Sequence, residues 1–466
     1  MSRPWWRKAR LGEECDEPAS HLVRSMAYET LVVGFTAIAV AILAFLVSRG
    51  QLEDLYLKAR GSAPVSDQVA VLTIGPEALY LWNSEQPQPE ITPRDMLAEL
   101  VRFADQAGAS VIVLDVMMEA PQEGDAALAE AVAQANAPVI SATRFVPTAP
   151  TSKREFQPGL SPTIGDGLHT GFANLQVEQP WLFADGQLVR HAPLVRQVST
   201  ARVPTGAWPG NIVGAEQADD ALLPSMTLLA AMLHVGSSEQ SLLSACPIAP
   251  GQVLACSKGT DSLGLPATPL PLEQGMVINF RGPEGHDGIA SVRAASVLRA
   301  VGPAALARQM GMEMPAQAPE LEAALKDKVV LIGRVDRIGE GDADRFVTPY
   351  SFPTLVQADM AGVRVQAQVV DTLLSGRHIR QPRLWPWWLV GLGLAVGVVV
   401  SGRFVRDDVH ATGWSLLAVV LGVLGVLIFK WSDGWSLPLG PPLAGLLLAL
   451  LAVHGYGWSV EESKRT

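Results

Sequence analysis

The sequence predicts an α/β domain, with a parallel-rich sheet and flanking helices, that is joined to four transmembrane α-helices, one N-terminal and three C-terminal. Three observations support this fold class. Four long stretches are apolar and free of Asp, Glu, Lys and Arg. Between the first and second stretches, short apolar runs that suit buried strands alternate with helical patterns. Charged residues make up only 17% of the 466 residues, against about a quarter in soluble domains.

The four apolar stretches have the length and the flanks of membrane spans. A bilayer core about 30 Å thick needs roughly 20 apolar helical residues. Seven of the 12 tryptophans lie at the edges of the last three stretches, where amphipathic rings favour the headgroup level. A cleaved signal peptide is the alternative for the first stretch, but Ser48-Arg49-Gly50 is a poor cleavage site. The predicted spans are residues 384–402, 411–429, 437–458 and, around the charge-free stretch Leu31–Val47, residues 27–48, which include Glu29.

Basic residues near the spans favour cytoplasmic termini. Four basic residues lie within the first ten positions, and an even number of spans places residues 1–26 and 459–466 on the same side of the membrane. The region 49–383 then lies outside the cytoplasm. It holds 25 basic and 36 acidic residues, which accounts for the whole net charge of −11. Such an acidic chain does not suit a nucleic-acid partner, so the lipid bilayer is the first partner predicted.

Alternating strand and helix patterns predict the start of a parallel sheet. Val69–Ile74 is a short apolar run that ends at Gly75-Pro76, as a buried strand does. Thr92-Pro93 opens a helix with proline at its first position. The order of elements places helices on the faces of a parallel sheet. After the first strand, the predicted elements are a helix from Pro93 to Gly108, a strand over Ser110–Asp115, a helix over Asp125–Ala135 and a strand over Pro138–Ala142.

The middle and the end of the region continue this pattern less regularly. Lys328–Gly333 is a further buried strand that is closed by glycine, and Val363–Leu374 is a helix that leads toward the second span. Strand and turn pieces are predicted at Gly171–Leu175 and Asp185–Arg190, and Pro224-Ser225 opens a helix that continues to Val235.

Several short motifs follow one another along this region. They are Thr92-Pro93-Arg94, Gly108–Asp115, Asp125 with its helix, Gly171–Leu175, Asp185-Gly186 with Arg190, Pro224-Ser225, Ile278–Pro283, Val330–Gly333, Asp344–Pro349, and Gly362-Val363 with Ala367. In this order they resemble the type-2 CHASE (CHASE2) domain, an extracytoplasmic sensory module of bacterial histidine kinases, nucleotide cyclases and Ser/Thr kinases. The arrangement of one span before the domain and three after it also resembles this family.

The resemblance implies a sensor in the bacterial inner membrane, with its large domain periplasmic or extracellular. Members of the family usually continue into a cytoplasmic catalytic domain, whereas Ser459–Thr466 is too short to fold into one. We therefore expect no enzyme activity, and we expect the signal to pass through the transmembrane bundle to an effector in trans. A structural or accessory subunit of an envelope membrane complex is the alternative, and a homo-oligomer is compatible with both interpretations.

Four polar residues at strand ends or helix starts are the predicted ligand-binding residues. Ligands of open α/β sheets gather outside the carboxyl ends of the strands, and Asp115 stands at such an end. The competing interpretation is structural, with Asp115 capping a neighbouring backbone and Arg94 pairing with it. The predicted residues are Arg94, Asp115, Asn279 and Arg281.

The sequence predicts no catalytic residue, no cofactor and no metal site. It contains no P-loop, no H-E-x-x-H and no G-x-S-x-G motif, and its spacing shows no nucleophile–base pair. The thioethers of Met310, Met312 and Met314 suit Cu(I), but apolar packing is the preferred interpretation. Asp336 and Gly339–Asp344 have oxygen ligands that suit calcium, but EF-hand spacing is absent and a solvated acidic turn is preferred.

One disulfide is predicted in the extracytoplasmic region. Cys246 and Cys256 lie ten residues apart on the oxidising side of the membrane. Two free thiols are the alternative, and Cys15 is left over in the cytoplasm.

Small residues predict close helix packing in the second span. Gly393, Gly397 and Ser401 recur every four residues and line one helix face. This face packs either within the bundle of this chain or against a second copy or a partner protein, and the sequence does not separate the two.

Overall fold

The computed structural model of the chain describes most of the α/β region and a few residues after it. The chain forms two compact units, and Asp54–Arg380 is the body of the larger one. The described residues are 51–82, 91–118, 120–147, 154–157, 168–178, 188–199, 220–246, 260–265, 275–309, 319–335, 344–351, 359–379, 389–394, 396 and 420.

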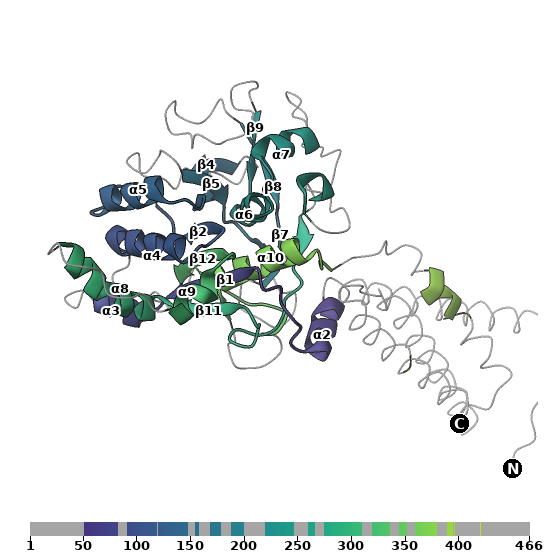
Figure 1. The fold of residues 1–466 in the computed structure, drawn as a ribbon. Coiled ribbons are helices and arrows are strands. Elements are labelled where there is room, and N and C mark those ends of the chain that lie inside the picture. The colour runs from purple at the N-terminus through teal and green to yellow at the C-terminus, as the bar shows by residue number, and fades with distance from the viewer. Residues whose placement is uncertain are drawn as a thin grey trace, which may run out of the picture. The chain divides into compact units, whose positions relative to one another are not determined.

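A parallel sheet forms the centre of the larger unit (Figure 1). Its parallel strands run in the spatial order β11-β1-β12-β2-β3-β5, and β4 pairs with β3 in the antiparallel sense. The chain crosses the sheet from β1 to β5 and then returns, because β11 pairs with the far side of β1 and β12 lies between β1 and β2. Such a reversal is typical of doubly wound folds. The strands are β1 (Val69–Ile74), β2 (Val111–Asp115), β3 (Val139–Pro147), β4 (Arg154–Gln157), β5 (Leu168–Phe172), β11 (Ala290–Arg293) and β12 (Val329–Arg334).

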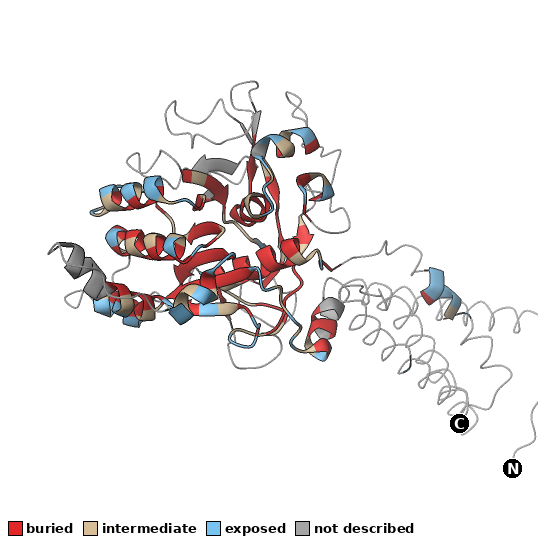
Figure 2. Ribbon diagram, viewed as in Figure 1, coloured by how far each residue is buried: buried red, intermediate tan, exposed pale blue. Residues whose placement is uncertain are grey.

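Helices cover both faces of the sheet because its central strands are apolar on both sides (Figure 2). Side chains alternate between faces along a strand, so Val71 and Val113 join the core beneath α6 and α10. Leu72 and Leu114 join the core on the other face, with α3, α4, α5, α8 and α9. The helices are α3 (Pro76–Trp82), α4 (Arg94–Gln106), α5 (Asp125–Gln134), α6 (Met226–His234), α8 (Ala294–Gln309), α9 (Pro319–Leu325) and α10 (Gly362–Ser375).

Smaller sheets and helices surround this layered body. β7 (Leu188–Ala192) lies between β6 (Gln176–Glu178) and β10 (Met276–Val277) in an antiparallel sheet of three strands. The remaining elements are α2 (Gln51–Arg60), α7 (Glu239–Ala245), a 3-10 turn at Thr260–Leu263, and the antiparallel pairs β8 (Val195–Ser199) with β9 (Asp220–Pro224) and β13 (Arg345–Phe346) with β14 (Met360–Ala361).

The structure confirms the predicted α/β class with a parallel-rich sheet, and it corrects several element boundaries. Pro93 is the N-cap of α4 and not its first helical residue. Similarly, Ser225 is the N-cap of α6, where its hydroxyl accepts a hydrogen bond from the amide of Leu228 at 3.1 Å. Of the piece expected at Gly171–Leu175, Gly171 and Phe172 form the end of β5, an outer strand of the main sheet.

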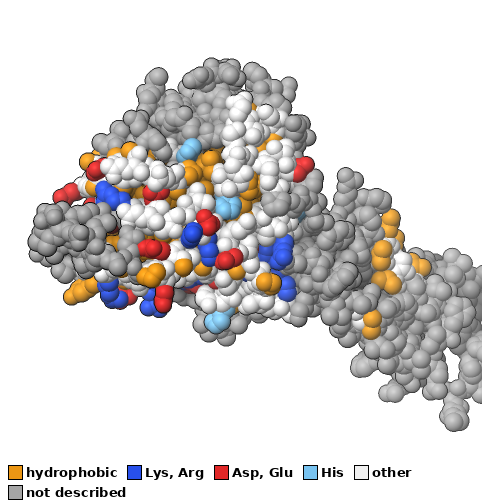
Figure 3. All heavy atoms as spheres, in the orientation of Figure 1, with side chains coloured by type: hydrophobic (Ala, Val, Ile, Leu, Met, Phe, Trp, Pro, Cys, Tyr) orange, Lys and Arg blue, Asp and Glu red, His pale blue; other side chains and the backbone are white. Residues whose placement is uncertain are grey.

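Within the described residues, no helix is both long enough and apolar enough to cross a bilayer. The four predicted spans lie almost wholly outside these residues, so they stay predictions. Residues 389–394 are helical, and the side chains of Leu389, Val390 and Leu392 are exposed. On the visible face of the larger unit, basic and acidic side chains are interspersed among apolar and polar ones (Figure 3).

The approach of β5 to α6 depends on the absence of a side chain at Gly171. A Cβ atom there would lie 2.4 Å from the Cα of Met226 and 2.5 Å from its backbone nitrogen. We expect Gly171→Ala to destabilise the full-length chain by about 1–3 kcal/mol, because two backbones would have to separate. Denaturant unfolding measures this change.

Gly75→Ala is the matched control, because the nearest atom to its added Cβ is Val335 Cγ2 at 4.0 Å. We expect this variant to stay within about 0.5 kcal/mol of the parent. Equal stability losses for the two variants would contradict the close approach of β5 and α6.

Candidate functional site

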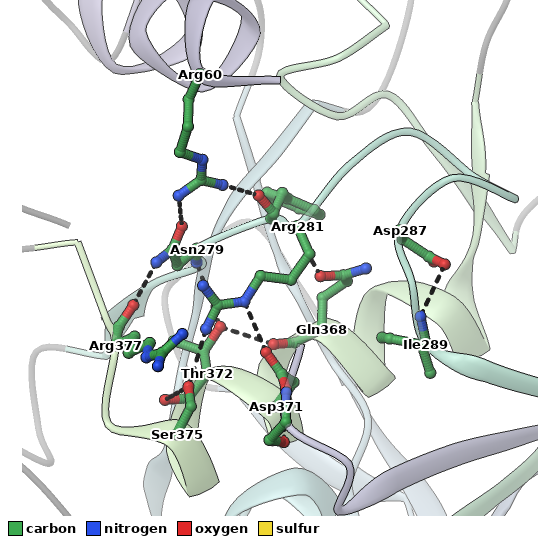
Figure 4. A network of polar contacts seen from close by, with 12 residues as sticks. Arg60, Asn279, Arg281, Asp287, Ile289, Gln368, Asp371, Thr372, Ser375 and Arg377 are labelled. Atoms are coloured by element: carbon green, nitrogen blue, oxygen red, sulfur yellow. Dashed lines mark hydrogen bonds and ion pairs between the residues drawn. The ribbon is translucent and has the colours of Figure 1, made fainter. Parts of the chain in front are cut away.

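The four predicted ligand-binding residues lie in three separate environments. Arg94 and Asp115 do not pair with each other, whereas Asn279 and Arg281 belong to one network of polar contacts (Figure 4). The structure therefore does not gather the four residues around one pocket.

Arg94 pairs with Asp125 and not with Asp115. It is the first residue of α4 and is fully buried, with its Nε 3.4 Å from Asp125 Oδ1. Gly124 makes the approach of the α5 N-terminus possible, because it has a φ of +89° and a Cβ there would lie 2.6 Å from the backbone nitrogen of Asp95. Burial lowers the pKa of Arg94 and the charge of Asp125 opposes this shift. The arrangement is a buried ion pair that joins the starts of two helices.

Asp115 lies at the carboxyl end of β2 beside a second carboxylate. Its register partner on β12 is Gly333, and a Cβ at Gly333 would lie 3.2 Å from the Cβ of Asp115 and 2.8 Å from that of Val363. Its Oδ2 is buried and has no hydrogen-bond partner. Burial first, and the negative charge of Asp344 second, raise the pKa of Asp115 well above its ordinary value. Asp115 does not act as a cap through this oxygen.

A fully buried ion pair forms the centre of the polar network. Arg281 and Asp371 are both 0% exposed, and Arg281 Nε donates to Asp371 Oδ2 at 2.7 Å. The other oxygen of Asp371 accepts hydrogen bonds from the amide and the hydroxyl of Ser66, both at 2.7 Å. Arg281 also donates from its amide to Gln368 Oε1 at 3.0 Å and from Nη2 to Ser375 Oγ at 2.9 Å. The pair thus links α10 to residues 66 and 281.

Asn279 extends the network to both ends of the domain. Its Nδ2 donates to the carbonyl oxygen of Arg377 at 2.5 Å, just after α10. Its Oδ1 accepts from Arg60 Nη1 at 2.6 Å, at the end of α2, and Arg60 Nη2 donates to the carbonyl of Phe280. The hydroxyl of Tyr350 donates to the carbonyl of Gly61 at 2.9 Å. Figure 4 shows Asn279 between Arg60 and Arg377.

A second buried ion pair holds the start of α2. Arg190 of β7 donates from Nε to Asp54 Oδ1 at 2.9 Å and from Nη2 to Asp54 Oδ2 at 2.5 Å. The two side chains are only 9% and 6% exposed. The carbonyl of Arg190 also accepts a hydrogen bond from the amide of Ile278 at 2.9 Å. β7 therefore contacts α2 through a side chain and the segment 278–281 through the backbone amide of Ile278.

We define the end junction as Arg60, Asn279, Arg281 and Asp371 with the Asp54–Arg190 pair. It binds α2, at the N-terminal end of the domain, and α10, at the C-terminal end, to one short segment after β10. Sequence reasoning identified Asn279 and Arg281 but missed their partners. A carboxylate within the apolar run of α10 was the available signal for Asp371, because a buried charge needs a partner.

One hydroxyl–imidazole contact is present, although the sequence spacing does not predict it. Ser110 Oγ lies 2.6 Å from His234 Nδ1, at the amino end of β2. Burial lowers the pKa of His234. Among the described residues, no carboxylate contacts this imidazole, so the pair lacks the third member of a triad.

The remaining predictions lie partly outside the described residues. Cys246 is buried and disulfide-bonded, but Cys256 lies outside them, so this pairing stays a prediction. Residues 310–314 and 336–343 lie outside them as well, and the described residues contain no group of three or more His, Cys, Asp or Glu that could hold a metal. Gly393 is helical with no atom within 4 Å of an added Cβ, whereas Gly397 and Ser401 are outside the described residues.

The raised pKa of Asp115 gives a pH-dependent prediction. When the pKa of a carboxyl is higher in the folded state, the folded protein loses stability as pH rises above the unfolded pKa of 3.8. We therefore expect Asp115→Asn to raise the thermal midpoint of the full-length chain at pH 7, by about 2–4 °C for each kcal/mol recovered. The difference from the parent should shrink toward zero as pH falls below 3.8, where the carboxyl becomes neutral in both states.

Glu320→Gln, in the exposed first turn of α9, is the control and should show no such trend. A midpoint at pH 7 that is unchanged or lower in Asp115→Asn would contradict the burial of a neutral carboxyl.

Comparison with known proteins places this geometry in a family. Searches of curated proteins and of solved structures gave no match. The CHASE2 domain profile matches residues 31–403, which include the whole α/β region and both ends of the junction. CHASE2 domains are extracytoplasmic sensory domains and not catalytic ones. Because the match covers most of the sequence, the chain belongs to the CHASE2 domain family.

Proposed function

We propose that the chain is a membrane-anchored receptor that detects an extracytoplasmic signal and passes it through a transmembrane bundle to an effector in trans. One observation carries this proposal: Asn279 and Arg281 bond to α2 and to the end of α10 at the same time. These are the two ends through which the domain continues into the apolar flanks of the sequence. A displacement of residues 279–281 would therefore change the contacts of α2 and of the end of α10 at the same time.

Membership of a sensory family supports this direction of signalling. In the proposed topology the helices at residues 27–48, 384–402, 411–429 and 437–458 lie in the bacterial inner membrane. Both termini are cytoplasmic and the α/β domain is periplasmic or extracellular. The partners are the lipid bilayer, an effector membrane protein and, through the small-residue face at Gly393, Gly397 and Ser401, a second copy of the chain.

A ligand can shift such a receptor only by binding its two arrangements with different affinity. We expect one chemical class of extracytoplasmic solute to raise the thermal midpoint of the full-length chain in lipid nanodiscs. Stabilisation of about 2.7 kcal/mol corresponds to a solute at 100 times its Kd. The same solute should change amide exchange at residues 51–60 and 278–281.

Asn279→Ala is the matched variant for this experiment. It should still be stabilised by the solute, but the change in exchange at residues 51–60 should be lost. Two results together would contradict the receptor proposal and favour an accessory subunit. No solute of the panel would change the thermal midpoint, and the chain would purify in a stoichiometric envelope complex whose removal unfolds it.

A further inference from the structure

We propose that the carboxyl groups of Asp115 and Asp344 form a proton-binding site that makes the start of α10 respond to the pH outside the cytoplasm. The site itself depends only on contacts within the α/β domain. Its role as a detector rests on the proposed function, and it names the proton as the extracytoplasmic signal.

Asp115 is held between the sheet and the first turn of α10. It ends β2, beside Gly333 of β12. A Cβ at Gly333 would lie 3.2 Å from the Cβ of Asp115 and 2.8 Å from that of Val363, so the absence of a side chain there lets Val363 approach Asp115. Asp115 Oδ2 is buried and has no hydrogen-bond partner. An ionised carboxylate in this place lacks the hydrogen bonds that would replace its water, so the neutral form is favoured.

Asp344 brings a second carboxyl to the same turn of α10. Its carbonyl oxygen accepts a hydrogen bond from the amide of Gly362 at 2.8 Å, and its Cγ would lie 2.9 Å from a Cβ added at Gly362. Asp344 is exposed, whereas Asp115 Oδ2 is buried. Asp344 therefore keeps its charge in water and Asp115 holds the proton, since burial and the charge of Asp344 both raise the pKa of Asp115 well above its ordinary value.

Two guanidinium groups lie near this turn, and both are bonded to other carboxylates. Arg345 bonds to Glu284 Oε2 at 2.8 Å and to Asp359 Oδ1 at 3.1 Å. Arg364 bonds to Asp287 Oδ2 at 3.2 Å. These three carboxylates neutralise the two guanidinium groups, so neither arginine has a free charge to offer Asp115.

Other described side chains around Asp115 are neutral or lie on the opposite face of the sheet. Arg334 ends β12 one residue after the register partner of Asp115, and side chains alternate between faces along a strand. Arg94 of α4 lies on that opposite face with a carboxylate partner of its own. α6 packs on β2 from the face of Asp115 and has no charged residue within Ser225–Leu233. Among the described residues, Asp344 is thus the charge that acts on Asp115.

Loss of the proton places two negative charges at one turn of the chain. Asp115 belongs to a central strand that β12 and β3 hold on both sides. Asp344 precedes β13, which pairs with β14 over only two residues. The repulsion therefore displaces the weaker side, residues 344–346 with 360–362, where α10 begins. A rise in pH opens this end of α10, and acidification closes it.

Infrared difference spectroscopy of the full-length chain in nanodiscs, without any solute, tests the site. The carbonyl band of a buried neutral carboxyl should be present at acid pH and disappear as pH rises, with a midpoint above 3.8. Asp115→Asn should lack this band at every pH. Asp344→Asn should keep the band but shift its midpoint to lower pH, because the like charge that opposes ionisation is removed. Glu320→Gln, in the exposed first turn of α9, should leave band and midpoint unchanged.

Hydrogen–deuterium exchange in the same nanodiscs tests whether the start of α10 responds. Peptides that cover residues 344–346 and 360–366 should exchange several-fold faster in the parent than in Asp115→Asn above the midpoint, and equally below it. Comparison of the two chains at the same pH cancels the pH dependence of the exchange chemistry. Peptides from β1 and β12 should exchange equally in both chains at either pH.

The proton-binding site is contradicted if Asp115→Asn keeps the band, or if Asp344→Asn leaves its midpoint unchanged. The response of α10 is contradicted if the parent and Asp115→Asn exchange equally above the midpoint. Neither measurement involves a solute or an effector, so a failure of the receptor proposal leaves both results unchanged.

Discussion

The ion pair between Arg281 and Asp371 places the strongest constraint on this molecule, because both of its charges lie in the interior. Removing a charged group from water costs several kcal/mol, and breaking a buried pair costs about 3–5 kcal/mol. The pair persists because Ser66, Gln368 and Ser375 satisfy the surrounding donors and acceptors. Two hydrophobic residues at these positions would avoid the cost of desolvating two charges. The presence of the ion pair therefore fits a role in setting the positions of α2 and α10.

The fold brings this pair together through elements that are far apart in the sequence. The parallel sheet anchors α10 on one face, while β7 and β10 deliver residues 278–281 to the same place. α2 then attaches to this segment through Arg60 and to β7 through Asp54. α2 and the end of α10 are therefore both bonded to one short segment, residues 278–281. This shared contact is the physical basis for proposing that a domain of a sensory family transmits a signal.

Local sequence signals predicted the sheet well and the polar contacts poorly. Val69–Ile74, Val111–Asp115 and Val329–Arg334 are short apolar runs closed by glycine or a polar residue, so their character is visible in the residues themselves. The partner of Arg281 lies 90 positions away, and no local pattern encodes that separation. The structural alternative predicts an ion pair between Arg94 and Asp115. In the structure Arg94 pairs with Asp125 instead, because the turn at Gly124 brings the start of α5 close to Arg94.

A distance measurement between the two exits tests most directly whether one segment holds them together. Spin labels on genetically encoded reactive residues at the exposed positions Ala59 and Arg377 leave the three cysteines unchanged. Pulsed electron–electron double resonance of the full-length chain should give one narrow distance distribution between the two labels. This distribution should broaden in Asn279→Ala and stay narrow in the remote control Asn136→Ala. A distribution that is already broad in the parent chain, or that stays equally narrow in Asn279→Ala, would contradict the end junction.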